Sequence, residues 1–200
     1  MGNTKINHIS LCAGYGGIDL GLSRIFRDFR TVCYVEVEAF CIANLVAKIE
    51  SKEQLLSPAP IYSDIKTFDA RPFRGLVDIL SGGFPCQPFS SAGSRKSTED
   101  SRHLFPDIER IILECEPRII FLENVMGLLS SKLGGEENTS VLKHVLESME
   151  SLGYLATAGI FSAIECGFPH QRKRIFIAGI RHGELEHPTI ERPCRGGANI

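Results

Sequence analysis

Cys86 is the residue of this sequence that is best placed for covalent chemistry. It follows a short stretch of apolar residues and glycines from Asp78 to Phe84, which indicates a strand that ends in an irregular Pro85-Cys86-Gln87 turn. In open α/β sheets the chemistry lies at the carboxyl ends of the strands, where such a turn would be found. A free cysteine is also often a small buried hydrophobe. The flanking prolines and glycines favour an exposed backbone, so we predict a cysteine nucleophile.

A glycine-rich turn and two carboxylates indicate a second kind of site. Gly14, Gly16 and Gly17 follow a short apolar segment and precede a helical pattern, so backbone N–H groups and a helix N-terminus would face a ligand. Glu36 ends the next apolar segment, about twenty residues on, where a carboxylate can accept hydrogen bonds from ribose hydroxyls. Asp64 ends the third and could accept one from an exocyclic amine. Each acid alone could equally cap a helix, but together with the glycines they favour an adenosine. A dinucleotide is the competing ligand, and the glycine spacing departs from its full fingerprint.

The elements that must position these residues alternate along the chain. Apolar segments typical of buried strands cover residues 6–12, 31–35, 61–62, 76–80, 118–122 and 174–180. Helical apolar spacing is found at residues 18–26, 40–46, 104–115 and 141–152. Such alternation predicts the α/β class, with a mostly parallel sheet and helices on both faces. Residues 85–102 are too long and polar for a simple connection, which predicts a functional loop.

Composition limits the classes of protein that this chain can represent. Hydrophobic residues make up 43% and charged residues 23% of the 200 positions, as expected for one folded globular domain. No apolar run approaches the ~18 residues that cross a bilayer, so we expect a cytoplasmic protein without a membrane partner. Seven cysteines at wide spacing do not form a zinc motif, which predicts reduced thiols and no metal. The net charge of −2 provides no global basic field for nucleic acid, but Arg172, Lys173 and Arg174 form a local cluster.

Several motifs in a fixed order make the chain resemble the cytosine-5 DNA methyltransferase family. The resemblance runs from about Ile9 to Arg181, and the PCQ and ENV motifs at strand ends are highly specific together. The motifs are the glycine turn, Glu36, Asp64, PCQ at Pro85 to Gln87, ENV at Glu123 to Val125, and QRKR at Gln171 to Arg174. The resemblance implies an S-adenosylmethionine-dependent methyltransferase (Rossmann-like) fold, with a catalytic domain over residues 1–181 and a short tail over residues 182–200. It also implies a bacterial or phage-type intracellular enzyme of restriction-modification, associated with the nucleoid when bound to DNA.

The resemblance assigns a role to each catalytic residue. Cys86 would attack carbon 6 of cytosine, because carbon 5 is too poor a nucleophile to accept a methyl group unaided. Glu123 would hydrogen-bond to N3 of the base through a carboxyl that carries or shares a proton, and Asn124 would hold the neighbouring groups in place. Arg174, together with Arg172, would bind the base oxygen and favour the thiolate, although the two arginines could also be solvated charges at a strand edge. The base would be extruded from double-stranded DNA into the pocket.

The implied cofactor is S-adenosylmethionine, which leaves as S-adenosylhomocysteine, and no metal is expected. Its contacts would come from the strand ends and the turns that follow them, at Cys12, Ala13, Gly14, Gly16, Gly17, Glu36, Val37, Asp64, Ile65, Gly83, Pro85 and Leu104. Cys12 departs from the family pattern, because many relatives carry there an aromatic residue that stacks on the adenine.

The sequence after Arg181 also departs from the family pattern. Relatives have a DNA-recognition region there, and then a helix that returns to pack beside the glycine turn. We therefore expect a split enzyme, a truncated form or a remnant, with a second polypeptide as the candidate source of target recognition and the late motifs. The surface that the helix would cover is predicted to be apolar. The alternatives are an RNA cytosine-5 methyltransferase, an idle module that binds S-adenosylmethionine or a partner, and, more distantly, a Rossmann oxidoreductase.

Overall fold

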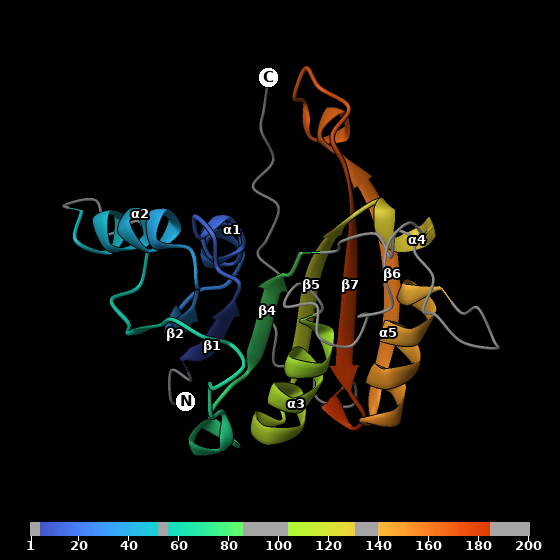
Figure 1. Ribbon diagram of the computed structural model, residues 1–200, viewed down its shortest axis with the longest axis horizontal. Helices are drawn as coiled ribbons and strands as arrows, with labels where there is room; N and C mark the ends of the chain where they lie inside the picture. Colours follow the sequence, from blue (N-terminus) through green and yellow to red (C-terminus); the bar gives the residue numbers. More distant parts are fainter. Residues whose placement is uncertain (1–4, 52–55, 86–103, 131–139, 185–200) are drawn as a thin grey trace, which may run out of the picture.

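A computed structural model of the chain describes residues 5–51, 56–85, 104–130 and 140–184. Its centre is a seven-stranded sheet in the order β3-β2-β1-β4-β5-β7-β6 (Figure 1). The strands are β1 (Ile6–Leu11), β2 (Phe29–Val35), β3 (Ile61–Tyr62), β4 (Ile79–Gly83), β5 (Ile119–Val125), β6 (Tyr154–Ser162) and β7 (Lys173–Arg181). The first five pair in parallel, and β7 is antiparallel to both β5 and β6. The predicted α/β class with a mostly parallel sheet is confirmed.

Helices cover both faces of this sheet, as predicted. One face carries α1 (Gly17–Ile25) and α2 (Ala39–Ile49), and the other carries α3 (Phe105–Cys115), α4 (Gly127–Ser130) and α5 (Val141–Ser151). Two short 3-10 helices complete the described elements, η1 (Arg71–Phe73) before β4 and η2 (Ala163–Cys166) between β6 and β7. The segment that contains η2 projects beyond the carboxyl edge of the parallel strands (Figure 1).

The alternation of side chains along each strand divides the interior between the two faces. Ile120 and Leu122 of β5 are fully buried and belong to the main core, which α3 and α5 complete with residues such as Ile108, Ile111 and Val145. Tyr34 of β2 points to the other face, where it packs with Leu45 of α2 and Leu56. Period-two burial in the strands thus leaves each helical layer one apolar surface to cover.

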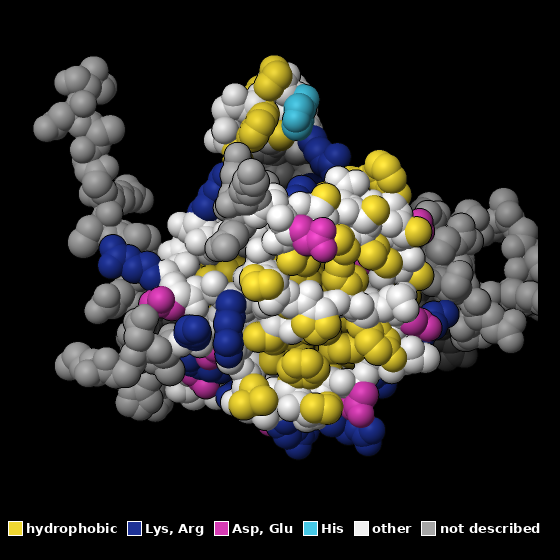
Figure 2. All heavy atoms as spheres, turned by 90° about the vertical axis from the view of Figure 1, so that its left-hand side faces the viewer, with side chains coloured by type: hydrophobic (Ala, Val, Ile, Leu, Met, Phe, Trp, Pro, Cys, Tyr) yellow, Lys and Arg dark blue, Asp and Glu magenta, His cyan; other side chains and the backbone are white. Residues whose placement is uncertain are grey.

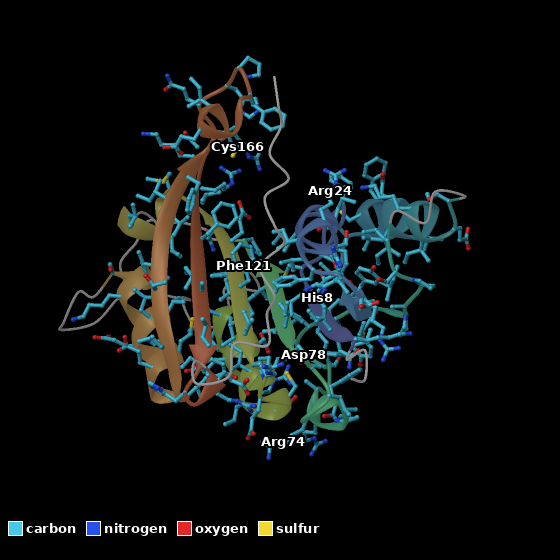
Figure 3. The ribbon with its side chains drawn as sticks, turned by 180° about the vertical axis from the view of Figure 1, so that it is seen from behind. His8, Arg24, Arg74, Asp78, Phe121 and Cys166 are labelled. Carbon is cyan, nitrogen blue, oxygen red and sulfur yellow. The ribbon has the colours of Figure 1, made fainter. Side chains whose placement is uncertain are left out.

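On the face that carries α1 and α2, no described helix covers the part of the sheet that β5, β7 and β6 form. Figure 3 looks onto this side, where β5, β7 and β6 lie side by side. Phe121 of β5, Phe176 of β7 and Phe161 of β6 form a row there, with ring centroids 5.5 Å and 5.7 Å apart. Leu155 of β6 lies on the same side and is 53% exposed, and Phe161 is 54% exposed. We call the surface made by these four residues the back-sheet face.

Two details of the fold differ from the sequence-based expectation. The nine-residue strand β6 was not predicted, because its side chains do not alternate in hydrophobicity and the strand lies at the edge of the sheet. The fourth strand was expected at residues 76–80 but runs from Ile79 to Gly83, so that Gly82 and Gly83 are within the strand. Among the described helices, none has the length and apolar character needed to cross a membrane.

Candidate functional site

The glycine turn lies where β1 ends and α1 begins. Gly14 and Gly16 have φ angles of 54° and 72°, a region that glycine adopts at little cost. The N–H of Gly16 donates to the carbonyl of Ala13 at 2.8 Å, and the N–H of Ala13 donates to the carbonyl of Val35 at 3.1 Å. The turn is therefore closed on itself and tied to β2, and helix α1 starts directly after it at Gly17.

Glu36 holds the same turn from the end of β2. Its Oε2 accepts the N–H of Gly14 at 2.6 Å, and its Oε1 accepts the N–H groups of Val37 and Glu38, each at 2.9 Å. The residue is only 7% exposed. Glu36 thus caps backbone N–H groups in the structure, which is one of the two roles that the sequence left open for it. Each carboxylate oxygen has two lone pairs, so Oε2 could still accept another hydrogen bond.

Cys12 occupies a strained position beside this carboxylate. Its φ angle is 47°, which is uncommon for a residue other than glycine. Burial, together with the negative charge of Glu36, raises the pKa of the Cys12 thiol to about 12. The thiol is therefore protonated at neutral pH and is suited to a packing contact rather than to nucleophilic attack.

Apolar side chains beside the turn are open to solvent. Val37 is 69% exposed, Phe40 is 71% exposed, and Phe40 meets Tyr15 edge to face at 6.2 Å. Figure 2 shows hydrophobic side chains gathered on the side of the molecule nearest α2. An exposed apolar side chain therefore stands directly after Glu36, beside the glycine turn.

Asp64 and Ile65 follow β3 at the same edge of the sheet. Asp64 is half-buried, and its Oδ1 accepts the N–H of Lys66 at 2.9 Å, which makes a local turn. Ile65 is 7% exposed and packs into the main core. Both residues therefore lie just after a strand end, as expected from the sequence, two and three residues beyond Tyr62, the last residue of β3.

The end of β4 brings further predicted residues to this edge. Gly83 is the last residue of the strand, and Pro85 is exposed just beyond it. Cys86 lies outside the described residues, as does most of the loop that was predicted to follow it. Leu104 is described again immediately before α3 and is partly buried against the main core.

Glu123 and Arg174 form the main charged pair of the site. The Nε of Arg174 lies 2.6 Å from Oε1 of Glu123. The side chain of Arg174 is 21% exposed and that of Glu123 is 24% exposed. The two residues come from β5 and β7, and Glu123 pairs in register with Gly83 of β4. A Cβ atom at Gly83 would lie 3.3 Å from Oε2 of Glu123, so glycine leaves room for the carboxyl group.

Asn124 and Arg172, the other two predicted catalytic residues of this part of the site, make different contacts. Asn124 is 1% exposed; its Nδ2 donates to the carbonyl of Phe84 at 3.0 Å, and its Oδ1 accepts the N–H of Val125 at 2.8 Å. Asn124 thus ties the end of β5 to the residue two positions before Cys86. Arg172 is exposed, and its backbone carbonyl accepts the N–H of Ala163.

A buried polar cluster below the glycine turn was not found from the sequence. Asp19 of α1 is 2% exposed and accepts hydrogen bonds from Ser10 at 2.8 Å and Thr31 at 3.0 Å. His8 lies 3.4 Å from Asp19 and contacts both Thr31 and Ser81. Burial alone would raise the pKa of Asp19, but the hydrogen bonds and the charge of His8 lower it below its ordinary value. Its members come from four different elements, β1, α1, β2 and β4, so no local spacing in the sequence indicates the cluster.

The described groups of the candidate site meet at one edge of the sheet. The carboxyl ends of β1, β2, β3, β4 and β5 lie next to one another and carry the glycine turn, Glu36, Asp64, Gly83 and Glu123. Among the described residues, no group of three or more His, Cys, Asp or Glu side chains could hold a metal ion.

Comparisons with known proteins agree on one family. The family model of C-5 cytosine-specific DNA methylases matches residues 6–194. The type II methyltransferase M.NgoMIV of Neisseria gonorrhoeae is 33% identical over 178 residues, which cover 89% of this chain and 53% of that protein. M.NlaX of Neisseria lactamica, also a type II methyltransferase, is 34% identical over 179 residues, with the same shares of 89% and 53%.

Solved structures agree with the fold. The Dnmt2 methyltransferase of S. pombe superposes with a TM-score of 0.69 at 23% identity, over 88% of this chain and 51% of that one. The chain therefore spans about half the length of the relatives that it matches.

Proposed function

Because the chain belongs to the C-5 cytosine-specific DNA methylase family, we propose that it is the catalytic and methyl-donor-binding part of a DNA (cytosine-5)-methyltransferase. The observation that carries the proposal is the meeting of two sites at one sheet edge. The glycine turn held by Glu36 lies at the ends of β1 and β2, and the Glu123–Arg174 pair lies at the end of β5. The catalytic domain is assigned to residues 1–181 and the tail to residues 182–200.

The residues present fit S-adenosylmethionine. A Cβ atom at Gly14 would meet nothing nearer than the carbonyl oxygen of Cys12 at 4.0 Å, so the turn leaves room for a ligand there. Glu36 has acceptor capacity for a ribose hydroxyl, and Val37 offers an exposed apolar surface. Asp64 and Ile65 would bind the adenine end, and Cys12, Ala13, Gly17, Gly83, Pro85 and Leu104 would line the remainder. When bound, the donor supplies a methyl group on a positively charged sulfur, which carbon 5 of cytosine accepts.

The side chains of this chain would activate the cytosine. The thiolate of Cys86 adds to carbon 6, which places an electron pair at carbon 5. Glu123 would act as a carboxyl that carries or shares a proton and would donate it in a hydrogen bond to N3 through Oε2 while negative charge develops on the ring. Arg174 holds Oε1 of Glu123 and so fixes the direction of the carboxyl group. Loss of the carbon 5 proton to water and expulsion of the thiolate from carbon 6 then restore the aromatic ring. Asn124 fixes the backbone between the two reacting strand ends through the Phe84 carbonyl.

The back-sheet face supports a further polypeptide in the working enzyme. Phe121, Phe161, Phe176 and Leu155 form an apolar surface that no described helix covers. Contiguous exposed apolar surface of this kind marks an interaction site. We infer that a second polypeptide, which also supplies target recognition, covers this face and that the complex acts on double-stranded DNA. A bacterial, intracellular location goes with this inference.

Transfer of labelled methyl groups tests the proposed activity. The full chain is incubated with labelled S-adenosylmethionine and either duplex DNA or RNA, with and without the product of any adjacent reading frame. Label in DNA supports the proposal, and label confined to RNA would replace it by the RNA alternative. Cys86→Ser should abolish transfer, because a hydroxyl is a far weaker nucleophile near neutral pH. Cys166→Ser, at an exposed cysteine of η2, is the matched control and should retain transfer.

A trapped intermediate identifies the nucleophile. Duplex DNA with fluorine at carbon 5 of the target cytosine has no proton there to lose, so elimination of the thiol is blocked. We expect a stable adduct at Cys86 by mass spectrometry. An adduct at any other cysteine would show that the assignment is wrong.

Calorimetry tests the donor site separately from the chemistry. Glu36→Ala should weaken binding of S-adenosylhomocysteine by about 1.5 to 3 kcal/mol, the value of a hydrogen bond to a charged group. Glu38→Ala is the matched control, because Glu38 is an exposed acid two residues away whose side chain makes no capping hydrogen bond. Equal affinities of wild type and Glu36→Ala would remove Glu36 from the site.

A further inference from the structure

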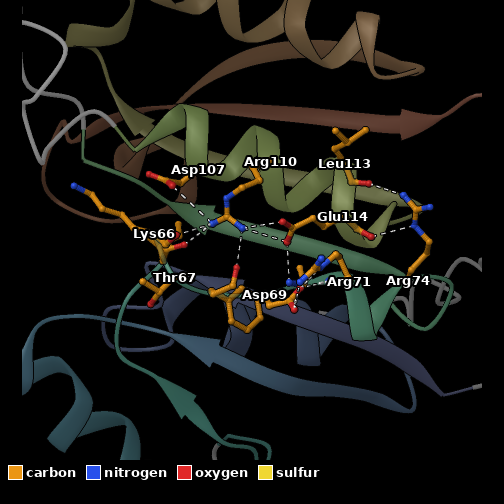
Figure 4. Close-up of polar contacts among 12 residues, drawn as sticks. Lys66, Thr67, Asp69, Arg71, Arg74, Asp107, Arg110, Leu113 and Glu114 are labelled. Atoms are coloured by element: carbon orange, nitrogen blue, oxygen red, sulfur yellow. Dashed lines mark hydrogen bonds and ion pairs between the residues drawn. The ribbon is translucent and has the colours of Figure 1, made fainter.

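The segment that follows β3 is held by a single arginine of helix α3 (Figure 4). Nη2 of Arg110 donates to the carbonyl of Ile65 at 2.8 Å, and Nη1 donates to the carbonyl of Phe68, also at 2.8 Å. A longer contact of 3.4 Å reaches the carbonyl of Lys66. Three backbone carbonyls within four residues therefore accept hydrogen bonds from one guanidinium group. Because its donors lie in one plane, this group fixes the direction in which the three carbonyls point.

Acidic groups on the same helix fix the position of Arg110 in turn. Glu114, one helical turn further on, lies 3.1 Å from Nη1, and Asp107, one turn earlier, lies 3.7 Å from Nη2. Glu114 also reaches the segment itself, because its Oε2 accepts the N–H of Ala70 at 2.8 Å. Arg110 is one-third exposed and Glu114 is 18% exposed, so these contacts are partly shielded from water.

Arg110 acts at the donor site through the backbone next to Asp64. The Ile65 carbonyl that it binds belongs to the residue after Asp64, and the carboxyl of Asp64 is itself hydrogen-bonded to the N–H of Lys66. A shift of the Ile65 and Lys66 backbone would therefore move the Asp64 carboxyl. Helix α3 also begins directly after Leu104, so Arg110 joins two segments that were assigned to the donor site.

We propose that Arg110 is a positioning residue for the methyl-donor site, which holds Asp64 and Ile65 at the place where they bind the adenine end of the donor. This inference rests on the proposed function. Arg110 does not contact the donor itself. It acts through the carbonyl groups of the segment after β3. Its loss lowers donor affinity and leaves the rate at saturating donor unchanged.

Arg74 offers a control with the same architecture at the other end of the segment. It also joins the β3–β4 connection to α3, through hydrogen bonds to the carbonyls of Leu113 at 2.9 Å and Glu114 at 3.1 Å. It pairs with Glu116 at 2.8 Å as well. Because it lies next to η1 and not next to Asp64, its removal loosens the same two elements without releasing the Ile65 carbonyl.

Calorimetry with S-adenosylhomocysteine on the full chain tests the inference. Arg110→Ala should weaken binding about tenfold, and Arg110→Lys, which keeps a charged donor, should recover part of that loss. Arg74→Ala should lower the melting temperature but leave the affinity as in wild type. Unchanged affinity in both Arg110 variants, or an equal loss in Arg74→Ala, would overturn the inference.

A double-mutant cycle separates positioning from general loosening. In an Asp64→Ala background, Arg110→Ala should have less than about half of its effect on affinity, since the group that it positions has been removed. A full, additive effect would overturn the inference. Wild type that does not bind S-adenosylhomocysteine would refute the proposed function itself, whereas binding by wild type with an additive cycle refutes only the role of Arg110.

Discussion

Replacement of Asp19 by asparagine tests the buried cluster that supports α1 below the glycine turn. The carboxylate accepts two hydroxyl hydrogen bonds, from Ser10 at 2.8 Å and Thr31 at 3.0 Å, and lies 3.4 Å from His8. A hydrogen bond to a charged group contributes about 1.5 to 3 kcal/mol, against about 1 kcal/mol for a neutral one. Asp19→Asn keeps the shape but removes the charge, so the free energy of unfolding should fall by about 2 to 4 kcal/mol. That is a large part of the total stability of an ordinary domain.

The pH dependence of the free energy of unfolding provides a second test of the Asp19 prediction. The folded-state pKa of Asp19 is lowered, so its contribution is fully present above the unfolded value of about 3.9 and is lost as the pH falls through the folded value. The difference between wild type and Asp19→Asn should therefore shrink as the pH falls below about 4.

The free energy of unfolding of wild type and Asp19→Asn is measured by urea unfolding at each pH. Asp69→Asn is the control in this assay. Hydrogen bonds from Arg71 lower the pKa of Asp69 to about 2. Both side chains are exposed, however, so water and salt screen the pair and its removal should change stability little. The reasoning fails if Asp69→Asn destabilises the protein as much as Asp19→Asn, or if the Asp19 difference persists undiminished at the lowest pH where both proteins fold.

Two further predictions concern the glycine turn. Gly16→Ala should lower the free energy of unfolding in urea by about 1 to 3 kcal/mol, because an L residue is strained at a φ of 72° and its Cβ would lie 2.7 Å from Leu56; a variant as stable as wild type would contradict this. At pH 8 the Cys12 thiol, whose pKa burial and Glu36 raise to about 12, should react with iodoacetamide much more slowly than exposed Cys166, as followed by peptide mass spectrometry. Equal labelling rates would show that Cys12 is more accessible or more acidic than the structure indicates.

Sequence patterns were sufficient for the fold class and for the residues at the strand ends. The glycine turn, Glu36 and Asp64 all precede or follow short apolar segments, and parallel strands bring such positions to one edge regardless of the details of packing. The same patterns could not predict the ion pair between Glu123 and Arg174, because it depends on β7 pairing antiparallel to β5.

Contacts between elements that are distant in the sequence could not be predicted in this way. Arg110 looks like a charged residue on the solvent side of an amphipathic helix, and nothing in its spacing indicates that it binds the carbonyls of Ile65 and Phe68. Strand β6 was missed because apolar residues do not alternate with polar ones along it: Leu155, Ile160 and Phe161 are all about half exposed.

The position of β7 between β5 and β6 has a consequence for the order of assembly. β5 and β6 both precede β7 in the chain; β5 already pairs with β4, whereas β6 is joined to the sheet only through β7. During synthesis from the N-terminus, Glu123 therefore emerges well before Arg174, and β6 has no neighbour until the last described strand is inserted between them. The ion pair closes in the final step of sheet formation. A ribosome-bound chain that stops before β7 thus holds the glycine turn but not the Glu123–Arg174 pair, which makes completion of the sheet and completion of the site the same event.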